Sequence, residues 1–183
     1  MDIAPECFQF LLEKSVECKD ILNDTEFKQL KTYKRHNFTN TYDHSIRVAV
    51  GSAIIAELLN TDVDSAIKVG LVHDMCFVDR HERKYHDGFY VFYHPVEACD
   101  NAHKKFSLTD VEANAIKAHM FPLAVSIPMS KVALALTLSD KIIAVYEGLY
   151  CIKILRKYLG YLGLKEIDNF KCKDITGDKH YSI

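Results

Sequence analysis

Residues 66–75 read AIKVGLVHDM, an apolar helical segment that ends in the adjacent pair His73 and Asp74. Adjacent side chains in the middle of an α-helix point about 100° apart. Both can therefore reach one metal ion only if the ion lies beyond the end of the helix, which is where this pair is expected. A histidine–aspartate pair also arises by chance, so by itself it is weak evidence for a metal site.

Further potential metal ligands lie on both sides of this pair, each in or at the end of a segment that we expect to be helical: His44, His94, His119 and Asp140. Neutral imidazoles and carboxylates suit divalent metals such as iron, manganese, zinc and cobalt. The six residues exceed what one ion normally takes from a protein, so they suit two ions bridged by Asp74. Taken singly, each histidine has an ordinary alternative as a packing, capping or surface residue, so the prediction depends on the combination.

Asp140 is the candidate whose oddity is clearest from the pattern alone. Its segment, KVALALTLSDKIIAVYEG, places Asp140 on a mostly apolar helical stripe with Leu136 and Ile143. A buried carboxylate without compensation is very costly. Asp140 therefore needs a metal ion, a hydrogen-bond network, or an ion pair with an arginine or lysine across the core, and its own segment does not decide among these.

The composition predicts an all-α fold that forms one domain over residues 1–183. Of these 183 residues, 49% are apolar and 26% are charged, as in a globular protein with one substantial core. Only 7 glycines and 4 prolines leave few turn signals, which favours long helices over a multi-stranded sheet. The expected helices cover residues 4–22, 24–34, 42–60, 62–74, 94–106, 109–120, 129–147 and 149–164.

Local signals support some of these boundaries. Thr109 and Glu112 have the spacing of a capping box at a helix start. Pro95 fits the first turn of a helix, so we expect His94 to open that helix and the aromatic run before it, FYVFYH, to form a short extended piece. Gly51, two turns after His44, leaves room for close approach of another helix.

Charge, hydropathy and cysteine spacing exclude several classes of protein. The net charge of −2 gives no basic surplus for binding nucleic-acid phosphates. No stretch approaches the roughly 18 apolar residues that a membrane span needs. The six cysteines form no CxxC motif, and the N-terminus has no secretory signal pattern. We therefore expect reduced cysteines and a cytoplasmic protein.

The ordered set of ligands, in the contexts YDHSIRVA, GLVHDM, YHPVEA, IKAHMFPL and LSDKIIA, closely resembles the HD superfamily of metal-dependent phosphohydrolases. The resemblance covers about residues 38–147. It is strongest to the branch with two metal ions, which includes the diadenosine tetraphosphatases and, more distantly, the HD-GYP cyclic-dinucleotide phosphodiesterases. The chain lacks the GYP signature, which argues against the latter activity.

The resemblance implies a compact helical bundle with a central site for two divalent metal ions. It implies that one ion is held by His44, His73, Asp74 and Asp140, and that Asp74, His94 and His119 serve the second. Iron or manganese is our first expectation for a histidine-rich site, and zinc, cobalt, nickel and magnesium remain open.

A phosphohydrolase of this type needs no nucleophilic side chain. Two metal ions about 3.5–4 Å apart can bridge a water molecule and lower its pKa so that it attacks phosphorus. The phosphate oxygens need cationic donors, and Arg47 is our first choice because it lies one turn from His44. Arg80 and Lys141 are the next candidates. An ordinary surface charge is the alternative for each of the three.

The expected substrate is a small-molecule phosphate, with a nucleotide as first choice. Two other functions remain open: a regulatory module that binds metal or nucleotide without turnover, and a di-iron oxygenase on the same scaffold. The aromatic and apolar segment 145–164 predicts a final helix packed on the bundle, a dimer interface or a membrane-surface contact. The protein is accordingly expected to be a monomer or a homodimer.

Overall fold

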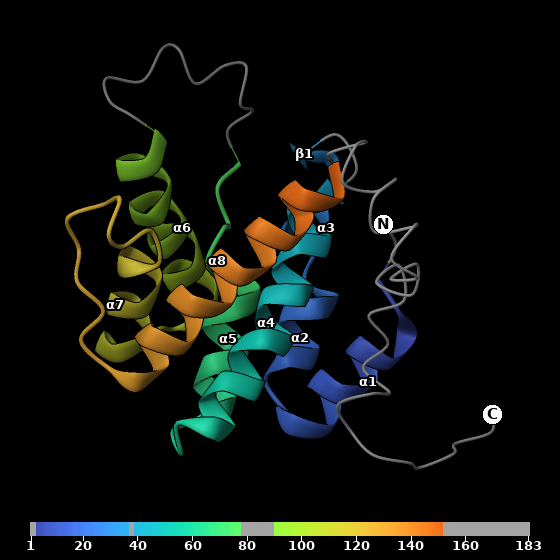
Figure 1. Cartoon of the computed structure of the whole chain (residues 1–183). Helices are drawn as coiled ribbons and strands as arrows, with labels where there is room; N and C mark the ends of the chain where they lie inside the picture. Colours follow the sequence, from blue (N-terminus) through green and yellow to red (C-terminus); the bar gives the residue numbers. More distant parts are fainter. Residues whose placement is uncertain (1–2, 37–38, 78–89, 152–183) are drawn as a thin grey trace, which may run out of the picture.

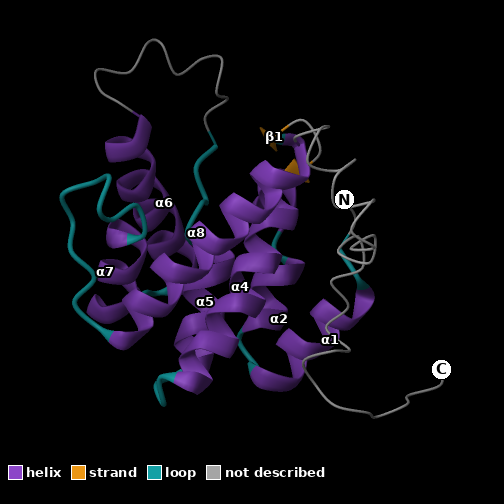
Figure 2. Cartoon of the chain, in the orientation of Figure 1, coloured by secondary structure: helices purple, strands orange, loops and turns teal. Residues whose placement is uncertain are grey.

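The computed structural model describes residues 3–36, 39–77 and 90–151. Within them the fold is all-α, as predicted, apart from one pair of short antiparallel strands (Figure 2). The elements are α1 (Pro5–Lys14), α2 (Cys18–Asn23), α3 (Thr25–Gln29), the 3-10 helix η1 (Leu30–Thr32), β1 (Lys34–His36), β2 (Thr39–Asn40), α4 (Thr41–Leu58), α5 (Val63–Val72), α6 (Tyr90–Phe106), α7 (Asp110–Ala118) and α8 (Lys131–Cys151).

Helices α4 and α5 form the centre of the bundle, and α8 packs across both of them (Figure 1). Helices α6 and α7 lie on one side of this central group, and α1 to α3 lie on the other. On the second side Leu11, Ile21 and Phe27 are almost fully buried. Burial of such a side chain contributes about 1.5–3 kcal/mol, so the N-terminal helices are held to the centre mainly by hydrophobic packing.

Two glycines let the central helices approach closely. A Cβ atom on Gly70 would lie 2.6 Å from the Cα atom of Ala49, so the backbones of α4 and α5 are in contact there. A Cβ atom on Gly51 would collide with the hydroxyl of Ser139 on α8. That hydroxyl donates a hydrogen bond of 2.8 Å to the carbonyl of Val48. The close approach predicted at Gly51 is therefore confirmed.

The N-terminal boundaries differ from the prediction. The single helix expected over 4–22 is wrong, because the chain leaves α1 at Ser15, whose backbone is extended. The hydroxyl of Ser15 then accepts a hydrogen bond from the backbone N–H of Cys18 and restarts the chain as α2. The α-helix expected over 24–34 is observed only as α3, because η1 and β1 follow it.

Helix α6 begins earlier than predicted. The extended piece expected before His94 is wrong from Tyr90 onward, because α6 starts at Tyr90 and places Pro95 in its second turn. The ring of Tyr90 stacks on the imidazole of His94 at 4.3 Å between centroids. The Nδ1 atom of His94 also lies 2.7 Å from the carbonyl oxygen of Tyr90. These two contacts stabilise an N-terminal turn that the proline pattern alone does not predict.

At the other end of the bundle, α8 runs through Gly148 to Cys151 without a break. The boundary expected between 129–147 and 149–164 is therefore wrong, and residues 152–164 lie outside the described part of the chain. No helix among the described residues combines the length and apolarity needed to cross a membrane.

Candidate metal centre

The six predicted ligands come together inside the bundle from α4, α8, the second turn of α6 and the C-terminal ends of α5 and α7. All of them are buried, with at most 3% of each residue exposed: His44, His73, Asp74, His94, His119 and Asp140. Burial of six polar side chains in one place requires mutual compensation or a bound cation.

Local capping explains where His73 and Asp74 lie. Asp62 caps the start of α5 by accepting a hydrogen bond from the N–H of Ser65. The helix ends at Val72, so His73 is its C-cap and Asp74 follows it. The pair therefore lies just beyond the last helical residue, as the sequence predicted, and both side chains turn inward.

The other ligands follow from similar signals. The capping box of Thr109 and Glu112 is confirmed at the start of α7, and His119 is the C-cap of that helix. His44 lies in the first turn of α4, which Asn40 caps by accepting from the N–H of Asp43. The expectation that His94 opens its helix is wrong, because His94 lies in the second turn of α6.

One group of candidate ligand atoms is formed by His44, His73 and Asp140. These atoms all lie within 4.8 Å of one another, so they could hold a metal ion. The Oδ1 atom of Asp140 lies 3.1 Å from Nε2 of His44 and 3.7 Å from Nε2 of His73. We call this set the first group. Asp140 thus faces two imidazoles, an arrangement that suits either a hydrogen-bond network or a metal ion.

A second group lies directly beside the first. Its candidate ligand atoms come from His73, Asp74 and His119, again within 4.8 Å of one another. His94 joins it, since its Nε2 atom lies 3.0 Å from Nε2 of His119 and 3.5 Å from Oδ1 of Asp74. The other oxygen of Asp74, Oδ2, lies 3.6 Å from Nε2 of His73. Asp74 thus stands between the histidines of the two groups.

Three of the histidines have their tautomer set by backbone carbonyl groups. The Nδ1 atoms of His73, His94 and His119 lie 2.7–2.8 Å from the carbonyl oxygens of Gly70, Tyr90 and Ile116. A carbonyl oxygen only accepts hydrogen bonds, so each Nδ1 carries the proton. In a neutral imidazole each Nε2 then presents a lone pair to the centre, which is the arrangement that metal-binding histidines use.

The electrostatics of the second group favour a cation. Burial lowers the pKa of His119 well below its usual value of 6.5, and the nearby His73 and His94 lower it further. His119 is therefore neutral at pH 7, and its Nε2 lone pair faces that of His94 at 3.0 Å. Two lone pairs at this distance repel unless a cation lies near them. The donor set of imidazoles and carboxylates fits a divalent metal ion of the iron, manganese or zinc type.

The three predicted phosphate-binding cations have different surroundings. Arg47 donates from Nη1 to Oε1 of Glu147 at 2.9 Å and to the hydroxyl of Thr39 at 3.2 Å. Lys141 donates from Nζ to the carbonyl oxygen of His119 at 2.9 Å, and burial lowers its pKa. Both side chains therefore lie beside segments that carry candidate ligands. Arg80 lies outside the described residues.

Glu147, which was not among the predicted residues, is a carboxylate that is only 1% exposed. Its Oε2 atom lies 2.9 Å from Nδ1 of His44, and Oε1 pairs with Arg47. The signal was present, because Glu147 follows Asp140 by two helical turns and so continues the same stripe of α8. His103, on the same helix as His94, is exposed.

Comparisons with known proteins place the chain in a family. No curated protein and no solved structure matches the chain significantly. The model of the HD domain family matches residues 41–145, which is more than half of the chain and includes all six candidate ligands. The protein therefore belongs to the HD domain family.

Proposed function

We propose that this protein is a metal-dependent phosphohydrolase that cleaves a phosphate ester or anhydride of a nucleotide or related small molecule, using two divalent metal ions. Members of the HD domain family are generally metal-dependent hydrolases, and HD domains bind divalent metals. The number of ions, their identity and the substrate are the parts that we propose beyond this family property.

The position of Asp74 carries the proposal for two ions. One of its oxygens faces His94 and His119, at 3.5 and 3.8 Å from their Nε2 atoms. The other oxygen faces His73, which both groups share. A carboxylate whose two oxygens face different imidazoles, one of them shared with the first group, is suited to bridge two ions. We propose iron or manganese, with zinc, cobalt, nickel and magnesium as alternatives.

When bound, two divalent ions would activate a water molecule for attack on phosphorus and offset the negative charge that develops there. The residues of the chain would hold and orient these ions. Asp74 and Asp140 bring two negative charges that compensate the cations in the buried centre. The histidines present neutral lone pairs, because their Nδ1 protons are held by acceptors on the far side of each ring.

The substrate phosphate is proposed to contact the three cations named from the sequence, Arg47, Arg80 and Lys141. Arg47 and Lys141 support this because each lies beside a ligand-bearing segment, near His44 and His119 respectively. A positive charge at such a position attracts phosphate oxygens. We propose a small-molecule substrate rather than a nucleic acid, since the chain carries no basic surplus.

A matched pair of histidine variants on α6 tests the proposal. His94→Ala removes a candidate ligand, whereas His103→Ala removes an exposed histidine from the same helix. We expect the wild-type protein, purified under nitrogen, to contain about two metal ions per chain. In His94→Ala the metal content should fall towards about one, and phosphate release from a panel of nucleotides, dinucleoside polyphosphates and sugar phosphates should be lost.

One control and two contradicting outcomes complete this test. His103→Ala should retain both the metal content and the phosphate release of the wild type. If the wild-type protein bound no divalent metal even after reconstitution, the hydrolase proposal would be wrong and a regulatory module without turnover would replace it. Oxygen consumption by the metal-loaded protein with no phosphate released would assign the di-iron oxygenase function instead.

A further inference from the structure

Glu147 and Asp140 contact the same imidazole ring from its two opposite nitrogens. Asp140 faces Nε2 of His44 at 3.1 Å, and Glu147 faces Nδ1 of the same ring at 2.9 Å. The two carboxylates are seven residues apart on α8, which is roughly 10 Å along the helix axis. His44, which is fully buried, spans the space between them.

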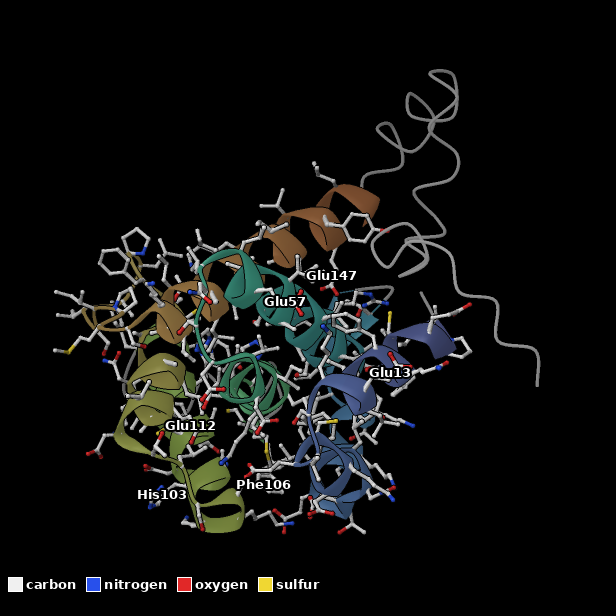
Figure 3. The ribbon with its side chains drawn as sticks, turned by 90° about the horizontal axis from the view of Figure 1, so that it is seen from below. Glu13, Glu57, His103, Phe106, Glu112 and Glu147 are labelled. Carbon is white, nitrogen blue, oxygen red and sulfur yellow. The ribbon has the colours of Figure 1, made fainter. Side chains whose placement is uncertain are left out.

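Arg47 ties Glu147 to α4 a second time. It lies one turn after His44, and its Nη1 atom lies 2.9 Å from Oε1 of Glu147. Each oxygen of the Glu147 carboxylate therefore has its own partner on α4, with His44 at Oε2 and Arg47 at Oε1. Figure 3 shows Glu147 on α8, apart from the other buried glutamate that it labels, Glu112.

The acceptor at Nδ1 of His44 differs from those of the other three histidines. In His73, His94 and His119 the Nδ1 atom faces a backbone carbonyl group three or four residues earlier in the chain. His44 lies in the first turn of α4, and its Nδ1 atom faces a carboxylate from another helix, Glu147, at 2.9 Å. The acceptor of His44 is therefore a side chain, which a substitution can remove without changing the backbone of α4.

The tautomer of His44 is a real choice because Asp140 competes for the proton. If the proton were on Nε2, it would be donated to Oδ1 of Asp140 at 3.1 Å. The lone pair of Nε2 would then be lost to any metal ion in the first group. The contact of Nδ1 with Glu147, at 2.9 Å, is shorter than that of Nε2 with Asp140, which favours the opposite tautomer. A carboxylate that accepts from Nδ1 also makes Nε2 a stronger ligand.

We propose that Glu147 is a positioning residue that holds His44 in the tautomer presenting Nε2 to the first group, and thereby sets the affinity of that group for a divalent cation. The effect on metal affinity rests on the metal site of the proposed function. The effect on the tautomer does not, so the two can fail separately.

The alternative is that Glu147 only fastens α8 to α4, and a matched control separates the two roles. Glu147→Ala removes the acceptor, and Glu147→Gln keeps the size of the side chain but removes its charge. Glu112→Gln is the control, because Glu112 is also buried and paired with a cation, Lys68, at 3.4 Å. Among the described residues Glu112 pairs with Lys68 and with Thr109, and glutamine preserves the capping box. Glu112→Gln therefore reports the cost of a lost buried carboxylate that faces no histidine.

The first readout is the tautomer of His44 in the metal-free protein, measured by nitrogen-15 NMR of the imidazole. We expect the proton on Nδ1 in the wild type and in Glu112→Gln, and on Nε2 in Glu147→Ala. The second readout is affinity for Mn²⁺ or Zn²⁺, measured by competition with a chelator. Glu147→Ala should bind about 10- to 100-fold more weakly than the wild type, the usual loss for a partner behind a metal-binding histidine.

Each outcome decides one claim. An unchanged His44 tautomer in folded Glu147→Ala would overturn the positioning role. A changed tautomer with unchanged metal affinity would overturn its link to the metal. If the wild type bound neither ion, the proposed function would fail while the NMR result still judged the role of Glu147. If Glu147→Ala did not fold, Glu147→Met, which fills similar space without an acceptor, would take its place in both measurements, with the same expected change of tautomer and loss of affinity. Glu147→Gln would not serve in the first measurement, because its amide oxygen can still accept from Nδ1.

Discussion

The two groups of candidate ligands are built on different kinds of support. The first group stands on α4, α5 and α8. The backbones of α4 and α5 are in contact at Gly70, and the side chain of Ser139 on α8 packs against Gly51. The second group depends on helix ends and on individual side-chain contacts. Lys141 reaches the carbonyl of His119, and Asn101 on α6 donates to the carbonyl of Met75 at 2.8 Å. Backbone packing therefore positions the first group, and single hydrogen bonds position much of the second.

Asp74→Ala should have the largest effect, because Asp74 is a ligand of the second group and also faces His73, which both groups share. We expect the loss of both metal ions, and phosphate release should fall by more than about 10³-fold. The protein should remain helical, because Asp74 lies beyond the end of α5 and no helix is interrupted. Metal analysis, circular dichroism and a phosphate assay test this. Retained activity in the variant would refute the proposed mechanism.

Gly70→Ala should break the support of the first group. The new Cβ atom would lie 2.6 Å from a backbone atom of Ala49, so α4 and α5 must move apart. Overpacking of this kind costs about 1–3 kcal/mol of the free energy of unfolding. Chemical denaturation measures this loss, and metal titration should show weaker binding to the first group.

Gly148→Ala is the matched control for that change, since nothing lies within 4 Å of a Cβ atom at this helical position. It should raise the free energy of unfolding by about 0.5–1 kcal/mol through the higher helix propensity of alanine. Metal affinity in Gly70→Ala equal to that in Gly148→Ala would show that the close contact of α4 and α5 does not position the first group.

The candidate ligands could be predicted from sequence because their signals are local. The apolar period of residues 66–72 ends where His73 begins, and the spacing of Thr109 and Glu112 marks the start of α7. Asp140 is conspicuous because a carboxylate interrupts an apolar stripe. Each of these signals lies within one helix. Residue types and helical periodicity could therefore indicate both the all-α fold and the six candidate ligands.

The parts that escaped prediction depend on contacts between distant segments. Glu147 is on the stripe of Asp140, but its partners on α4 are about a hundred residues away in the chain. The early start of α6 depends on the ring of Tyr90 stacking on His94. Strands β1 and β2 are too short to show an alternating pattern.

Lys141→Met should have a smaller effect, confined to the side of the second group. As a proposed phosphate contact, Lys141 should contribute to substrate binding, so we expect KM to rise by about 10-fold, the effect of roughly 1.4 kcal/mol, with kcat little changed. Metal content should stay that of the wild type. Steady-state kinetics together with elemental analysis test this. A fall in metal content at unchanged KM would instead show that Lys141 acts by holding the carbonyl of His119.

Asp24→Asn should have the smallest effect, because it changes a contact remote from both groups. Asp24 caps α3 and binds Lys105 on α6 at 2.6 Å, which links the N-terminal helices to the helix that carries His94. Burial alone would raise the pKa of Asp24, but the hydrogen bonds from Lys105 and the N–H of Phe27 outweigh it and lower the pKa below the usual 3.8. Asparagine caps a helix as well as aspartate does, so the variant removes only the charge.

The pH dependence of this variant follows from the sign of that shift. A carboxyl group with a lowered pKa in the folded state stabilises the protein above its unfolded-state pKa, and the contribution is lost as the pH falls through the folded-state value. Wild type should therefore be more stable than Asp24→Asn by about 0.2–1 kcal/mol near pH 6, and the difference should disappear as the pH falls below 3.8. Denaturation at a series of pH values measures it. Metal affinity should be equal in the two proteins near pH 6. A weaker second group in Asp24→Asn would show that its position also depends on how α6 is fastened to α3.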